Sequence, residues 1–149
     1  MKSPSKDKAL KLIIESQTER LSAVREFVSS AAREYGFDDE AINKIALAVD
    51  EACTNIIKHA YKSAADKQIE ISLQSDNGGF EIIISDQGTS FDPTAIDKPI
   101  MQDYLSHFRR GGLGIYLIRS LMDKVEYKAE PGKKNEVRLI KYLPVKNEQ

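Results

Sequence analysis

Glu51 and Asn55 lie four residues apart in a stretch with helical periodicity, so they share one helix face, away from its apolar stripe. A carboxylate there can accept a proton from a nucleophile, and an amide oxygen is a hard ligand suited to Mg2+. Lys58, seven residues after Glu51, lies on the same face and either stays solvated or reaches a phosphate. Because any amphipathic helix carries such residues on its wet side, the spacing alone favours a solvated face.

A second candidate is the segment 86–92, which follows the predicted strand 80–85. A carboxylate at Asp86 can accept a hydrogen bond from the exocyclic amine of adenine, whereas guanine presents a carbonyl at that position. Gly88 would let the backbone approach the base. A loop with Asx-type turns explains the same residues equally well.

A third candidate is the segment 109–114, two arginines followed by a glycine-rich run that leads into a helical pattern. Free backbone amides at a helix start form an anion site, and the arginines favour phosphate. The segment lacks the Gly-Lys-Ser/Thr of a Walker A loop, and Leu117 stands where a dinucleotide fingerprint has its third glycine. The alternative is a flexible helix entry.

The elements that must position these segments follow from hydrophobic periodicity. Gly36 suits a left-handed cap at the end of the first helix, and Asp38 or Asp39 an N-cap of the second. Residues 93–110 show no clear period and predict a lid with one short helix over 101–108. The predicted strands are 9–15, 68–74, 80–85, 125–130 and 137–143, and the predicted helices are 18–35, 38–61 and 114–123.

This order predicts an α+β two-layer sandwich, in which a mixed, mostly antiparallel sheet of about five strands is covered on one face by three helices. With 149 residues the chain is one domain, spanning 9–145 after a flexible tail at 1–8.

The composition of the chain indicates which kinds of partner and which cellular compartment to expect. A net charge of -1 argues against nucleic acid as a direct partner. The sequence shows neither a signal segment nor an apolar run of membrane-spanning length, so we expect a soluble cytoplasmic protein. Cys53 lies on an apolar helix face and is expected to be a buried core residue; the alternative is a reactive thiol.

The three segments, in this order, resemble the motifs of the GHKL (histidine kinase-like) ATP-binding superfamily. Residues 47–61 resemble its N box, 86–92 its first glycine box, and 111–114 its second. Within that superfamily the whole chain, up to Leu143, is similar to the anti-sigma factor serine kinases of the RsbW type.

This resemblance implies a Bergerat fold that binds ATP and Mg2+ and phosphorylates a serine on a STAS-type anti-sigma antagonist. It also implies that the protein holds a sigma factor inactive, in a partner-switching system, and forms a homodimer. The alternative is a non-catalytic module that binds ATP or ADP and a protein partner.

The same resemblance assigns roles to individual residues. Glu51 matches the general base, Asn55 the Mg2+ ligand and Asp86 the carboxylate that reads adenine, while residues 93–110 match the ATP lid. Many relatives carry a Gly-Thr pair entering the last strand, where this chain has Lys134 and Asn135, so Asn135 is the polar residue left to substitute in that contact. The remaining expected ATP contacts are Lys58, Gly88, Asp92, Arg110, Gly111, Gly112, Leu113 and Gly114.

Overall fold

The computed structural model describes residues 10–61, 66–76, 78–87, 114–129 and 134–144. Alternating apolar residues form five strands in one sheet, with the order β1-β2-β3-β5-β4. The strands are β1 (Leu10–Glu15), β2 (Gln68–Asp76), β3 (Gly79–Asp86), β4 (Lys124–Ala129) and β5 (Asn135–Tyr142).

All four strand pairings in this sheet are antiparallel, whereas the sequence analysis predicts a mixed, mostly antiparallel sheet. β3 and β4 run in the same direction because both are antiparallel to β5, which lies between them. The connection from β3 to β4 passes through a helix, as parallel strands require, and the final hairpin then returns β5 to the middle.

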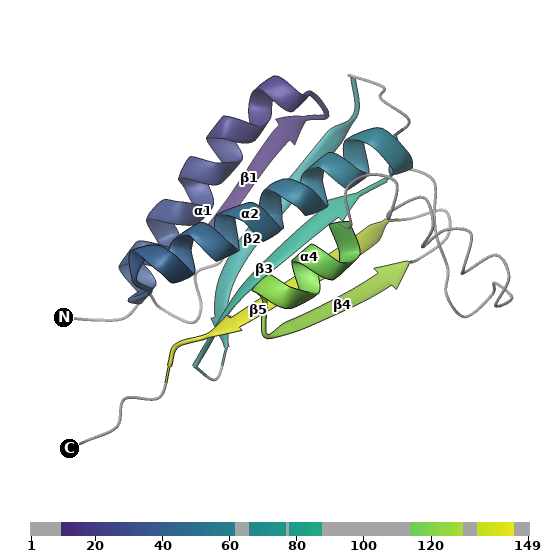
Figure 1. Ribbon diagram of the computed structural model, residues 1–149. Coiled ribbons are helices and arrows are strands. Elements are labelled where there is room, and N and C mark those ends of the chain that lie inside the picture. The colour runs from purple at the N-terminus through teal and green to yellow at the C-terminus, as the bar shows by residue number, and fades with distance from the viewer. Residues whose placement is uncertain (1–9, 62–65, 77, 88–113, 130–133, 145–149) are drawn as a thin grey trace, which may run out of the picture.

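In the part of the chain that the structure describes, three α-helices form the second layer and cover one face of the sheet, which confirms the predicted sandwich (Figure 1). They are α1 (Leu21–Tyr35), α2 (Asp39–Asn55) and α4 (Gly114–Leu121), and α2 packs against both of the others. The apolar stripe of α2 is buried as its periodicity predicts, with Ile45 and Val49 fully enclosed. Beneath it lie the fully buried strand residues Ile69, Ile71, Ile82, Ile84 and Leu139.

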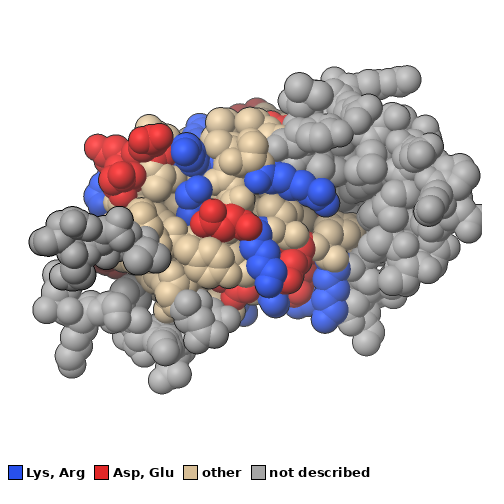
Figure 2. Space-filling model, turned by 60° about the horizontal axis from the view of Figure 1, so that its bottom comes forward, with Lys and Arg blue, Asp and Glu red and all other residues tan. Residues whose placement is uncertain are grey.

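The exposed surface carries both signs of charge. Lysine and arginine side chains alternate with acidic ones across the described part of the face in Figure 2. On strand β5, Arg138 forms ion pairs with both neighbouring strands. Its Nε lies 2.9 Å from Glu81 Oε2 on β3, and its Nη1 lies 3.7 Å from Glu126 Oε1 on β4. Within the described residues, no helix is long and apolar enough to cross a membrane.

The element boundaries differ from the predicted ones in several places. A 3-10 turn (Thr18–Arg20) precedes α1, so the α-helix begins three residues later than predicted. At its end Gly36 has φ +123°, the positive angle expected of its cap. β5 begins at Asn135, two residues earlier than predicted, and α2 gives way to a π-helix (Ile56–Ala60) instead of continuing as an α-helix.

The N-cap of α2 resolves the choice between two aspartates. Asp38 Oδ1 accepts a hydrogen bond from Ala41 N at 2.9 Å, whereas Asp39 is the first helical residue. We expect Asp38→Ala to lower the free energy of unfolding by about 1 kcal/mol, because the helix loses its cap. Urea denaturation measures this loss of stability. The control is Asp39→Ala, which removes an exposed ion pair between Asp39 Oδ1 and Arg33 Nη2 (3.4 Å) and should have a smaller effect.

Candidate functional site

The C-terminal turn of α2 holds the first pair of predicted site residues. Asn55 is buried, with 7% of its surface exposed, although it is polar. Glu51 is half-buried, and this burial raises the pKa of its carboxyl; the charge of Asp50 adds to the rise, and Lys58 opposes it. The pair is therefore not a fully solvated helix face, and Lys58 lies close enough to Glu51 for their charges to interact.

Immediately after Asn55 the helix widens into the π-helix Ile56–Ala60. Tyr61 N donates to Ile56 O at 2.9 Å, an i to i-5 bond that a regular α-helix does not make. Such π-turns are uncommon and occur frequently at functional sites. The widened turn places Tyr61 over the ends of two strands.

Tyr61 joins three segments through its hydroxyl. The hydroxyl donates to Gln68 O at the start of β2 (2.5 Å) and accepts from Gln87 N just after β3 (2.8 Å). Burial raises the pKa of Tyr61, the bond from Gln87 lowers it, and the charge of Asp86 raises it further. The hydroxyl therefore remains protonated and able to donate, and it holds the backbone next to Asp86 in place.

Asp86 and Asn135 form a buried polar pair at the end of β3. They are opposite each other in the β3–β5 ladder, and Asn135 Nδ2 donates to Asp86 Oδ1 at 3.0 Å. Their exposures are 4% and 1%, so each needs protein partners in place of water. The structure thus brings together two residues that are 49 positions apart and that the sequence analysis links only through the resemblance.

These groups converge at one end of the sheet. The last turn of α2, the end of β3 and the start of β5 lie at the same end in Figure 1, and α4 begins beside them. Gly114 is the first residue of α4, as expected for a helix start that could bind an anion. The predicted lid over 93–110, the helix over 101–108, and Gly88, Asp92, Arg110, Gly111, Gly112 and Leu113 lie outside the described residues.

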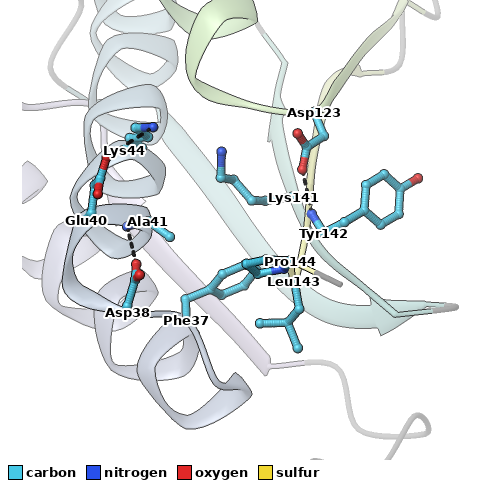
Figure 3. Close-up of a pocket in the computed structure, with 10 residues that line it drawn as sticks. All are labelled: Phe37, Asp38, Glu40, Ala41, Lys44, Asp123, Lys141, Tyr142, Leu143 and Pro144. Atoms are coloured by element: carbon cyan, nitrogen blue, oxygen red, sulfur yellow. Dashed lines mark hydrogen bonds and ion pairs between the residues drawn. The ribbon is translucent and has the colours of Figure 1, made fainter. Parts of the chain in front are cut away.

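A hollow of about 520 Å³ lies elsewhere, between the start of α2 and the end of β5 (Figure 3). Its polar groups are used in the fold: Asp38 caps α2, Asp123 accepts from Tyr142 N (2.7 Å), and Lys141 Nζ donates to Leu121 O (2.7 Å). No predicted site residue lines it. We therefore place the candidate site at the opposite end of α2, despite the size of this hollow.

Cys53 is a core residue, as expected. It is fully buried, and this burial, together with the charge of Asp50, raises the pKa of its thiol to about 12, so the reactive-thiol alternative is not supported. Within the part of the chain that the structure describes, no three His, Cys, Asp or Glu side chains cluster as metal ligands.

Comparisons with known proteins show similarity over most of the chain. The family model of the histidine kinase-like ATPase domain matches residues 14–141. The chain is 38% identical to the serine-protein kinase RsbW of Halalkalibacterium halodurans, over 83% of this chain and 77% of the relative. It is 31% identical to RsbW of Bacillus subtilis, over 90% of this chain and 85% of the relative.

A solved structure shares the fold. The crystal structure of the RsbU and RsbW domains of Rv1364c from Mycobacterium tuberculosis superposes with a TM-score of 0.65 at 15% identity. The match covers 91% of this chain and 32% of that longer chain. At this identity the likeness shows the fold alone.

Tyr61 is the residue that the sequence analysis missed, and its hydroxyl is testable. Tyr61→Phe keeps the buried ring but leaves Gln68 O and Gln87 N without that partner, so we expect the free energy of unfolding to fall by about 1–3 kcal/mol. ATP affinity should fall as well, because Gln87 adjoins Asp86. Tyr142→Phe, at a 46% exposed tyrosine on the far end of β5, is the matched control and should change neither quantity in urea denaturation and calorimetry.

Proposed function

This chain belongs to the RsbW family of serine-protein kinases, within the histidine kinase-like ATPases, and from that premise we propose a specific activity. It transfers the γ-phosphoryl group of ATP to a serine on a STAS-type anti-sigma antagonist, with Mg2+, and in its other state binds a sigma factor. It acts in the cytoplasm as a homodimer. The observation that carries the nucleotide site is the buried Asp86–Asn135 pair beside the last turn of α2.

Asp86 reads adenine in this proposal. A carboxylate has about four lone-pair positions, and Asp86 accepts the bond from Asn135 Nδ2 at one of them. The carboxylate can therefore also accept from the exocyclic amine of adenine, which guanine lacks at that position. Asn135 and Tyr61 act through Asp86: one aligns its carboxylate, and the other holds the backbone that follows it.

Asn55 fits the role of a single protein ligand to Mg2+. Its amide oxygen is a hard ligand, and Asn55 is buried at the end of α2, immediately before the π-helix. Nucleotide-bound Mg2+ needs few protein ligands, because phosphates and water complete its octahedral shell. When bound, the ion neutralises phosphate charge; positioning and orientation remain the work of the protein.

Glu51 is the proposed general base for the attacking serine hydroxyl. It lies one turn before Asn55, on the side where the ion and the phosphates would be held. Its raised pKa makes it a stronger base than a solvated glutamate. Lys58, whose positive charge opposes that rise, is the proposed partner of a phosphate.

The second candidate is the non-catalytic module, in which ATP or ADP acts only as a conformational ligand. The two functions differ in one observable, which is transfer of labelled phosphate to a STAS-domain protein encoded beside the gene. If the wild-type protein binds ATP and transfers no phosphate to that protein, the kinase proposal fails and the module is correct.

Asp86→Asn tests the adenine contact. The amide offers a donor where adenine also presents a donor, so ATP-dependent stabilisation should be lost. In the wild-type protein, ATP at about 100 times its Kd should raise Tm by roughly 5–10 °C. GTP should raise it far less.

Thermal melts with and without ATP measure this shift, and Asp39→Asn, at an exposed position of α2, is the control that should keep it. An unchanged shift for Asp86→Asn would remove the adenine assignment.

Glu51→Gln tests the base. We expect phosphotransfer to fall by about 100-fold or more, while ATP binding is kept, because glutamine cannot accept the proton. Glu40→Gln, at an exposed glutamate in the first turn of the same helix, should leave the rate unchanged.

The proposed role of Glu51 predicts how the phosphotransfer rate changes with pH. Only the ionised carboxylate accepts a proton, so kcat/KM should fall as pH drops through the pKa of Glu51, which lies above its ordinary value. Lys58→Met removes the group that lowers this pKa, so the acidic limb of the profile should move to higher pH. A profile that does not move would contradict the assignment of that limb to Glu51.

A further inference from the structure

Asp50 lies directly before the proposed base Glu51, but its carboxylate is bound by another helix. Arg25 Nη1, on α1, donates to Asp50 Oδ1 at 2.6 Å, a short charge-assisted hydrogen bond between α1 and α2. The side chains of Arg25 and Asp50 are 47% and 31% exposed, so the pair contributes little to the stability of the fold. We therefore looked for its role in the neighbouring site.

The rotation of the helix separates Asp50 from the site residues. Successive residues of an α-helix are about 100° apart around its axis, so Asp50 is about 100° from Glu51 and about 140° from Asn55. In Figure 1, α2 lies between α1 and α4 and packs against both. Because Asp50 is held on the α1 side, Glu51 and Asn55 lie on the side of α2 that is turned toward α4.

The charge of Asp50 acts on its neighbours in α2. It raises the pKa of the Glu51 carboxyl and also that of the Cys53 thiol, while Lys58 lowers the pKa of Glu51. A second carboxylate without a partner, directly beside the base, would oppose the ionisation of Glu51 more strongly. Arg25 supplies the opposite charge from the far side of Asp50, where it does not occupy the site.

Other charged side chains of the elements packed against α2 have different surroundings. On α1, Glu26 and Glu34 line a groove beside β1, and Arg33 lies 3.4 Å from an aspartate at the start of α2. On α4, Arg119 is exposed in the last turn. Beneath α2, Asp86 of β3 is buried within its own polar pair. The short pair therefore joins α1 to the part of α2 that holds the site.

We propose that Arg25 and Asp50 are positioning residues for phosphotransfer, whose ion pair fixes the direction of Glu51 and neutralises the carboxylate beside it. The proposal rests on the general base of the proposed function and names the side chains that support it. Neither residue touches ATP or the serine. With Asp50 tied to α1, Glu51 is the carboxylate left to accept the proton of the serine hydroxyl. Small displacements matter here, because a shift of about 1 Å in a reacting group can cost about 100-fold in rate.

Arg25→Met tests the positioning role in the full chain. We expect kcat for phosphotransfer to fall about tenfold or more, because Glu51 is no longer held in direction. KM for ATP should change little, since adenine is bound at Asp86. Arg25→Lys keeps a positive charge that can reach Asp50 and should restore most of the rate. Arg33→Met, which removes another ion pair between the same two helices, is the matched control and should keep the wild-type kcat.

The pKa of Glu51 separates this role from a merely structural one. Carbon-13 NMR of the Glu51 carboxyl in the nucleotide-free protein measures this pKa directly, and Glu51→Gln assigns the signal. Arg25→Met leaves the charge of Asp50 without its partner, so the pKa of Glu51 should rise. Asp50→Asn removes that charge, so the pKa should fall. Loss of a structural contact alone would not move the pKa in opposite directions in the two variants.

Thermal melts with and without ATP show that each variant is folded and binds the nucleotide. A wild-type kcat in Arg25→Met, or a Glu51 pKa that stays unchanged or moves in the same direction in both variants, overturns the positioning role and leaves the kinase standing. A wild-type protein that transfers no phosphate overturns the kinase and the positioning role together.

Discussion

A buried carboxylate at the end of the central strand constrains the arrangement of this fold. Asp86 ends β3, which pairs on both sides, and it is 4% exposed. A carboxylate held there needs donors supplied by the protein, because leaving it unsatisfied is costly. Asn135 meets this need only if β5 lies directly beside β3 in the observed register, with β4 displaced to the edge. The strand order and the candidate nucleotide site therefore depend on the same contact.

Much of the fold could be predicted from local patterns. The alternation over β2 and the three- and four-residue spacing over α2 reflect burial on one face, and both elements form as expected. The predictions from these patterns were wrong where the structure differs by a few backbone hydrogen bonds. Residues 56–60 have ordinary helical composition, so their periodicity does not distinguish the observed i to i-5 bonding from a regular α-helix. Lys134 and Asn135 have the composition of a turn, so the early start of β5 could not be predicted either.

The candidate site could be predicted to the extent that its residues are close in sequence or match a family motif. Glu51 and Asn55 share a helix face by spacing alone, and Asp86 lies at the end of a strand. Tyr61 could not be found in this way, because its partners Gln68 and Gln87 become neighbours only when α2 packs on the sheet. The link from Asn135 to Asp86 is likewise a product of strand register.

Register also connects the candidate site with the free edge. Asp86 lies opposite Ile69 on β2, and Ile69 lies opposite Ile14 on the edge strand β1. Ile69 is fully buried and Ile14 nearly so, which leaves this row of the sheet little room to rearrange locally. A small displacement at the end of β3 must therefore be taken up by the neighbouring strands together.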